Sequence, residues 1–164
     1  MYSVGDVIVY PMHGAGVIEE IEEREILGAV QKYYVMNISY GNMRVMLPMN
    51  NASKIGIRDV ISGDEADEVI SRFSFVEPAV NSNWNKRIRE NMEKIKSGDI
   101  NEVAVVVKSL MMRDRQKGLS TSERKMLSNA KQIFISELVL AKKTTNDEIE
   151  RELSSIVDRQ LKEA

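Results

Sequence analysis

The hydrophobic period of this chain changes once, near residue 62, and the change limits the folds that the sequence can adopt. Before it, apolar residues form short runs separated by turn signals such as Leu27-Gly28 and Gly41-Asn42, which is typical of strands and hairpins. After it, apolar residues recur every three to four positions, as they do in amphipathic helices. The sequence therefore predicts an α+β protein with a strand-rich N-terminal part and a helical C-terminal part.

The strand-rich part contains short β-branched runs that end at glycine or proline. Pro11 and Gly14 end the first run and Pro48 ends the fourth, because proline lacks the N–H that a sheet requires. Four or five strands with tight turns in about 60 residues predict a small antiparallel β-barrel. The expected strands cover residues 7–10, 17–25, 30–39, 43–47 and 54–58.

The helical part carries clear start and stop signals. Gly98 and Gly118 stand where helix C-terminal caps belong, and Ser120 with Glu123 matches a capping box. A compact helical domain is the simplest arrangement of these segments. The expected helices cover residues 64–75, 83–97, 100–117, 121–142 and 146–162. The expected organisation is a β domain at 1–62, a short helix and linker at 63–80, and a helical domain at 81–164.

The net charge of −2 conceals an asymmetry along the chain. Residues 1–75 hold six Lys and Arg against eleven Asp and Glu, whereas residues 81–131 hold twelve against six. An acidic front half and a basic middle predict two surfaces for two different partners.

The chemistry of the chain does not favour an enzyme or a bound cofactor. There is no cysteine, and a lone histidine, His13, lies in a Pro-Met-His-Gly turn with no second His or Cys to share a metal. No phosphate-binding or hydrolase motif is present. We expect no signal peptide, since no basic segment with an apolar core is visible before the first strand, and the most apolar stretch, 103–112, is too short for a membrane span. We expect a cytoplasmic protein that uses no cofactor, metal or membrane.

The segment from residue 83 to residue 96 combines an apolar stripe with flanking cations. At 100° per residue, Trp84, Ile88, Met92 and Ile95 share one face of a helix. In one interpretation all four enter the core and the cations are solvated. In the other, Trp84 extends beyond the helix end, where an indole among Arg and Lys suits nucleic acid. The pattern alone leaves both open.

The sequence resembles the CarD/CdnL family of bacterial RNA-polymerase-binding transcription regulators over nearly its whole length. The resemblance rests on the joint order and spacing of several elements. They are Val4-Gly5-Asp6, Val9-Tyr10-Pro11-Met12-His13-Gly14, Gly56-Ile57-Arg58-Asp59-Val60, Asn83-Trp84, Ser97-Gly98-Asp99, Arg113-Asp114, and Gly118-Leu119-Ser120 with Glu123.

The resemblance implies a Tudor-like N-terminal domain that docks on the β subunit of RNA polymerase. It also implies a helical domain that approaches promoter DNA at the upstream edge of the transcription bubble. The family tryptophan, matched by Trp84, is understood to wedge into the minor groove there, which favours the exposed interpretation of this side chain. Arg89 and Arg124 match basic DNA contacts of the family, with Lys86 and Arg87 as neighbours.

The polymerase contacts of the family match this chain less completely. Arg24 matches an arginine of the second strand, but the second basic position, on the fourth strand, is Met46. Arg44 lies two residues earlier and would project from the same strand face, so it is a candidate substitute. The alternative for Arg24 is an ion pair with neighbouring glutamates.

The function expected from the residues and the resemblance is stabilisation of the promoter open complex by a monomer bound to polymerase. DNA contacts would be mostly to phosphates and therefore largely independent of sequence. An alternative of another class is a protein-only adaptor on polymerase, which the acidic pI near 5.6 allows. A third hypothesis is recognition of modified peptides by Tyr33, Tyr34 or Tyr40, although these aromatics suit sheet packing.

Overall fold

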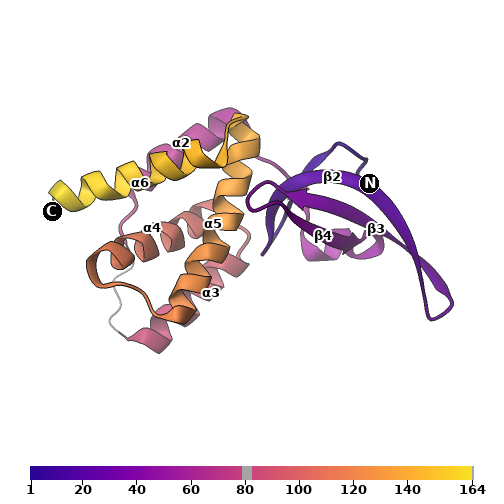
Figure 1. Ribbon diagram of the computed structural model, residues 1–164, viewed down its shortest axis with the longest axis horizontal. Coiled ribbons are helices and arrows are strands. Elements are labelled where there is room, and N and C mark those ends of the chain that lie inside the picture. Colours follow the sequence, from indigo (N-terminus) through magenta and orange to yellow (C-terminus); the bar gives the residue numbers. More distant parts are fainter. Residues whose placement is uncertain (79–82, 164) are drawn as a thin grey trace.

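The computed structural model describes residues 1–78 and 83–163. A five-stranded antiparallel sheet comes first along the chain and a group of helices follows it. Figure 1 shows the two parts side by side, with the N-terminus on the sheet and the C-terminus at the far end of the helical part. The α+β prediction is confirmed.

The sheet has the strand order β4-β3-β2-β1-β5 and is open at both edges. No pairing joins β4 to β5 within the described residues, so closure into a barrel is not confirmed. The predicted strand at 54–58 is wrong over most of its length, because η1 (Met49–Asn51) and α1 (Ala52–Ile55) precede a strand of only two residues. The strands are β1 (Val7–Tyr10), β2 (Gly14–Ile26), β3 (Ala29–Ile38), β4 (Met43–Pro48) and β5 (Arg58–Asp59).

A β-bulge in β2 explains the irregular hydrophobic pattern of that strand. Ile18 pairs with Met36 of β3, but Glu20 pairs with Val35, so one residue of β2 is inserted between them. An inserted residue exchanges the two faces of a strand from that point onward. Ile18 therefore lies in the sheet core, while Glu20 and the residues two and four positions later share the opposite face.

The helices lie within one residue of their predicted bounds. Side chains cap the N-termini of all five, with Ser62, Asn83, Asp99, Ser120 and Thr145 each accepting a backbone N–H. The expected boundary between residues 80 and 81 falls outside the described residues. The helices are α2 (Gly63–Phe75), α3 (Trp84–Lys96), α4 (Ile100–Lys117), α5 (Thr121–Lys142) and α6 (Asn146–Glu163).

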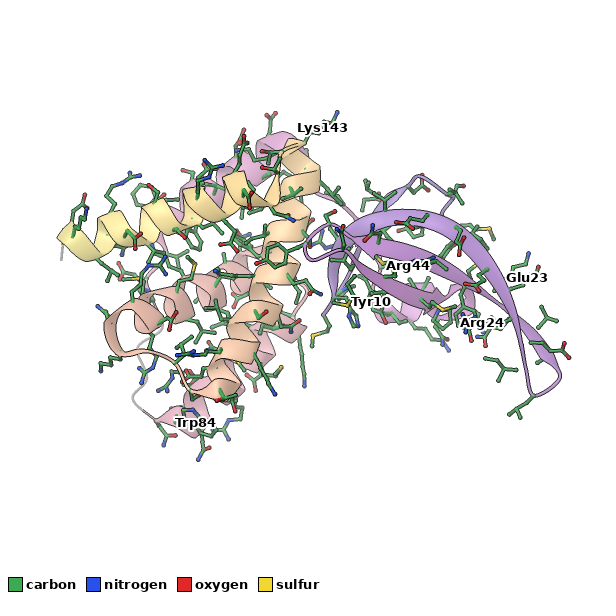
Figure 2. All side chains as sticks on the ribbon, viewed as in Figure 1. Tyr10, Glu23, Arg24, Arg44, Trp84 and Lys143 are labelled. Carbon is green, nitrogen blue, oxygen red and sulfur yellow. The ribbon has the colours of Figure 1, made fainter. Side chains whose placement is uncertain are left out.

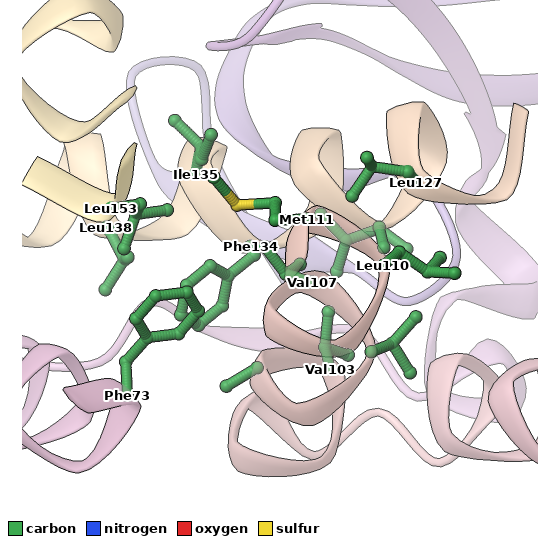
Figure 3. Packing of buried hydrophobic residues seen from close by; sticks show 14 of the residues in the cluster. Phe73, Val103, Val107, Leu110, Met111, Leu127, Phe134, Ile135, Leu138 and Leu153 are labelled. Atoms are coloured by element: carbon green, nitrogen blue, oxygen red, sulfur yellow. The ribbon is translucent and has the colours of Figure 1, made fainter. Parts of the chain in front are cut away.

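The helical core forms around α4 and α5, as Figure 3 shows. Phe73 of α2 stacks on Phe134 of α5, with ring centroids 5.8 Å apart and both side chains fully buried. Burial of a large apolar side chain contributes about 1.5–3 kcal/mol. Because Ala66, Val69 and Ile70 join the same cluster, α2 packs as part of the helical core, although the sequence assigned it to a connecting segment.

The turn between β1 and β2 packs directly against α5 and joins the sheet to the helices. The Ala15 N–H donates to Ser136 Oγ at 2.8 Å, and Gln132 Nε2 donates to the carbonyl oxygen of His13 at 2.7 Å. Gly14, with φ of 120°, has no room for a side chain, because an added Cβ would lie 2.5 Å from Ser136 Oγ. The Pro-Met-His-Gly turn is therefore a contact between the sheet and α5.

Two further polar contacts cross the same junction. The guanidinium of Arg58 donates to both carboxylate oxygens of Glu137 at 2.6 and 2.7 Å, and the hydrogen bonds raise the pKa of Arg58. Tyr40 donates its hydroxyl to Glu150 Oε1 at 2.8 Å; burial and this bond raise the pKa of Tyr40 to about 12. Bidentate arginine–carboxylate pairs have a narrow geometry, so they define how the two parts meet.

Gly14→Ala should destabilise the protein more than the same change at a glycine that also has a positive φ but has open space around it. Gly28 is the matched control: its φ is 80°, and an added Cβ would meet no atom within 4 Å. Overpacking costs about 1–3 kcal/mol, and the free energy of unfolding from urea titration should differ between the two variants by that amount. Equal losses would show that the junction does not require the glycine.

Candidate nucleic-acid interface

Trp84 lies at the end of the helical part where α3 and α5 begin, away from the sheet (Figure 2). It is the first residue of α3, and its side chain is 44% exposed. The Asn83 side chain caps the helix by accepting the N–H of Lys86 at 3.1 Å, which fixes where α3 begins. Figure 2 shows Trp84 at this end, with Arg24 and Arg44 on the distant sheet. The indole is therefore accessible to a partner.

The indole also contacts the start of α5. Trp84 Nε1 donates to Ser120 Oγ at 3.3 Å, and Ser120 is the N-cap residue of α5. Of the apolar stripe on α3, Ile95 is buried, and Ile88 and Met92 pack partly against the core. The stripe thus divides between core residues and one exposed tryptophan at its N-terminal end.

Arg87, a predicted DNA contact, is instead buried and paired within the helical part in this structure. It is only 6% exposed, and its Nε and Nη2 donate to the Glu123 carboxylate at 2.8 and 3.1 Å. The reason is its helical position, since a step of three residues from Trp84 turns Arg87 toward α5. Glu123, expected to complete a capping box, gives its carboxylate mainly to this arginine.

The electrostatics of this pair favour its ionised form despite burial. The hydrogen bond to Arg87 lowers the pKa of Glu123, an effect that burial opposes, and the bond to Glu123 raises the pKa of Arg87. A buried pair of this kind is costly to break, because one charge would remain without a partner. The pair joins α3 to α5 directly below Trp84.

Three predicted DNA contacts remain on the surface around the indole. Lys86 and Arg89 on α3 and Arg124 on α5 are exposed, and none has an ion-pair partner among the described residues. The Nε of Arg124 donates to the carbonyl oxygen of Leu119 at 3.3 Å, which leaves its Nη groups at the helix start. The arrangement provides an exposed aromatic ring next to cations from two helices.

The three candidate polymerase contacts share one face of the sheet. Val45 and Leu47 of β4 pack in the sheet core, so Arg44 and Met46 point to the opposite side. Strand pairing places Met46 opposite Val35 of β3, and Val35 in turn lies opposite Glu20 of β2. Arg24 lies four residues after Glu20 on β2 and therefore projects from the same face as Met46.

Both arginines on this face pair with glutamates of β2. Arg24 lies 3.5 Å from Glu22, and Arg44 lies 3.3 Å from Glu20, with all four side chains exposed. Exposed pairs of this kind contribute about 0–1 kcal/mol. Both arginines can therefore exchange these partners for others at low cost.

Sequence reasoning missed two features of the site. Ser120 was recognised as a cap, but its contact with Trp84 links positions 36 residues apart, which no local pattern reveals. The burial of Arg87 was also missed, because a cation beside an apolar stripe is normally solvated. One signal was present in the spacing. Trp84 and Arg87 lie three residues apart, as do Ser120 and Glu123, so two helix starts packed together can form both contacts at once.

The described residues contain no group of three or more His, Asp or Glu side chains placed to hold a metal ion. Among the helices that the structure describes, none has both the length and the apolar character needed to cross a membrane.

Comparison with known proteins gives one consistent result for both parts of the chain. Residues 2–61 match the family model of the CarD-like/TRCF RID domain, and residues 68–154 match that of the CarD C-terminal domain. The chain is also 43% identical over 149 residues to a Bacillus subtilis (strain 168) protein named "Putative transcription factor YdeB". The aligned region covers 91% of this chain and 97% of that relative.

Arg87→Ala should lower the free energy of unfolding by about 3–5 kcal/mol at neutral pH, because Glu123 would stay buried without a partner. Since the folded-state pKa of Glu123 is lowered from 4.5, the stability that the pair contributes is present above that pH. It is lost as the pH falls through the folded pKa, so parent and variant should converge in acid.

Arg72→Ala is the matched control for this prediction, since the Arg72–Glu68 pair is exposed. Its effect in the same urea titrations should stay within about 1 kcal/mol. A loss at Arg87 no larger than the loss at Arg72 would contradict the structural role of the buried pair.

Proposed function

Because the chain belongs to the CarD/CdnL family of transcription regulators, we propose that it stabilises the promoter open complex while bound to RNA polymerase. In this proposal the sheet docks on the β subunit through the face that carries Arg24, Arg44 and Met46. The end of the helical part where α3 and α5 begin contacts DNA at the upstream edge of the transcription bubble. The two ends of the molecule thus serve two different partners.

The observation that carries the proposal is the placement of Trp84. A soluble domain normally buries its tryptophan to a large extent, yet this side chain is 44% exposed at a helix end surrounded by cations. Aromatic side chains that wedge between base steps use the same combination of an apolar ring and nearby positive charge. The geometry therefore supports contact with DNA at this end.

The energetics favour action on melted rather than intact DNA. A wedge in an intact duplex must unstack a base step, which costs a few kcal/mol. At the edge of the bubble, melting has already met most of that cost, so Trp84 binds the open state more strongly than the closed one. A ligand with such differential affinity shifts the equilibrium toward the state it prefers.

The cations around the indole supply attraction without base recognition. Lys86, Arg89 and Arg124 project from two helix starts, where they can approach phosphates, and phosphate contacts position a protein without reading sequence. This charge arrangement supports activity at many promoters.

In this proposal the sheet attaches the protein to RNA polymerase. Docking on polymerase raises the effective concentration of the helical part beside the bubble, so a modest affinity for DNA is sufficient. Arg24 and Arg44 suit this role because their present partners, Glu22 and Glu20, are exposed and weakly bound.

One observation favours the adaptor alternative. A shallow groove between α3 and α5 is lined by Ile88, Met92, Met126 and Lys125, and methionine-lined surfaces are common at protein contacts. An adaptor that used this groove would not need the indole. The tryptophan variant below therefore separates the two functions.

Trp84→Ala should shorten the lifetime of the open complex on a promoter that melts unstably, compared with the parent protein. Loss of about 1.4 kcal/mol of differential binding corresponds to a tenfold shorter lifetime. Phe75→Ala is the control, because Phe75 is also an exposed aromatic, 81% accessible on α2. If Trp84→Ala extends the lifetime as the parent does, the wedge is rejected and the adaptor is favoured.

Charge reversal on the sheet face should weaken binding to the isolated lobe of the polymerase β subunit. We expect Arg24→Glu and Arg44→Glu each to reduce affinity without changing the urea midpoint, since both side chains are exposed. Arg72→Glu on α2 reverses an equally exposed charge away from this face and should leave affinity unchanged. Unchanged binding by both sheet variants would exclude this face as the docking surface.

A further inference from the structure

Four side chains form a connected polar network between the starts of α3 and α5, which runs from Trp84 through Ser120 and Glu123 to Arg87. Trp84 and Arg87 lie three residues apart on α3, and Ser120 and Glu123 lie three residues apart at the start of α5. Trp84 donates to Ser120 at 3.3 Å, and Arg87 donates to Glu123 at 2.8 Å. Each residue of one helix therefore contacts its counterpart on the other.

The hydroxyl of Ser120 uses its complete hydrogen-bonding capacity within this network. A serine hydroxyl offers one donor and two acceptor positions. Its O–H donates to Glu123 Oε1 at 3.4 Å, and its oxygen accepts the Glu123 N–H at 3.2 Å and the Trp84 Nε1–H at 3.3 Å. Glu123 is itself held by the buried Arg87. The hydroxyl orientation is therefore fixed, and the acceptor position that faces the indole is fixed with it.

We infer that Ser120 is the positioning residue that holds the Trp84 indole in its DNA-contacting orientation, with the indole N–H turned toward the protein. This inference rests on the proposed function and deepens it. Because Nε1 is engaged, what Trp84 offers to a partner is the carbon face and edge of the ring. Such a surface stacks on any base, so the wedge recognises a distorted base step and not a particular base.

The polar network also restricts the motion of the indole before DNA binds. A side chain that is already ordered loses less conformational entropy on binding than a freely rotating one. The serine that caps α5 thus contributes to DNA contact through the tryptophan, without touching DNA itself.

Intrinsic fluorescence tests this directly, because Trp84 is the sole tryptophan of the chain. We expect Ser120→Ala and Ser120→Gly to lower the steady-state anisotropy of the free protein. The acrylamide quenching constant should rise by up to about twofold, since the indole is 44% exposed at present and can become fully exposed. Ser120→Thr keeps the hydroxyl and should retain the parent values.

Two controls separate indole positioning from helix capping. Glycine is a much better N-cap than alanine, so Ser120→Gly removes the hydroxyl while α5 keeps its start, as circular dichroism can verify. Ser62→Ala removes the corresponding cap of α2, where Ser62 accepts the Glu65 N–H at 3.1 Å, and should leave the Trp84 fluorescence unchanged.

Open-complex lifetime supplies the functional readout. Ser120→Gly should shorten the lifetime in the parent background but have no effect in a Trp84→Ala background, because its action passes through the indole. Equal effects in both backgrounds, or anisotropy and quenching that match the parent in Ser120→Gly, would overturn the inference. If Ser120→Gly frees the indole but Trp84→Ala leaves the lifetime unchanged, the proposed function fails while the positioning role stands.

Discussion

The contact between the β1–β2 turn and α5 is the interaction on which the rest of the structure depends. The backbone at Gly14 approaches α5 too closely to leave room for a side chain. The backbone on either side of Gly14 forms hydrogen bonds with Gln132 and Ser136 of α5. Because α5 begins beside Trp84 (Figure 2) and contacts the sheet farther along its length, the same helix that holds the sheet also carries Ser120. One helix thus relates the proposed polymerase-docking face to the proposed DNA contact.

Charged residues have two different uses in this molecule, and burial decides which. Arg58 with Glu137 and Arg87 with Glu123 form short bonds to carboxylates that are almost fully buried, at the junction and below the indole. Removing one partner of such a pair is costly, so these pairs define geometry. Arg24, by contrast, has only an exposed glutamate partner and remains available for an intermolecular contact.

Local signals in the sequence predicted the helices but not the contacts between them. Caps such as Ser120 placed the helix starts within one residue, because capping depends on neighbouring backbone atoms. The burial of Arg87 depends on a residue 36 positions away, and the role of Gly14 depends on Ser136. Patterns among neighbouring residues do not reveal contacts between residues so far apart in the sequence. The exposed tryptophan was predicted by family resemblance, since its pattern alone also fitted a core residue.

The most direct test of the account is to identify what lies next to residue 84 in the working complex. With p-benzoyl-phenylalanine placed at position 84, ultraviolet irradiation of the complex of protein, polymerase and a forked promoter should cross-link the chain to DNA at the upstream edge of the bubble. Primer extension would map the cross-link to one or two nucleotides there. Cross-links to polymerase alone, with none to DNA, would contradict the account.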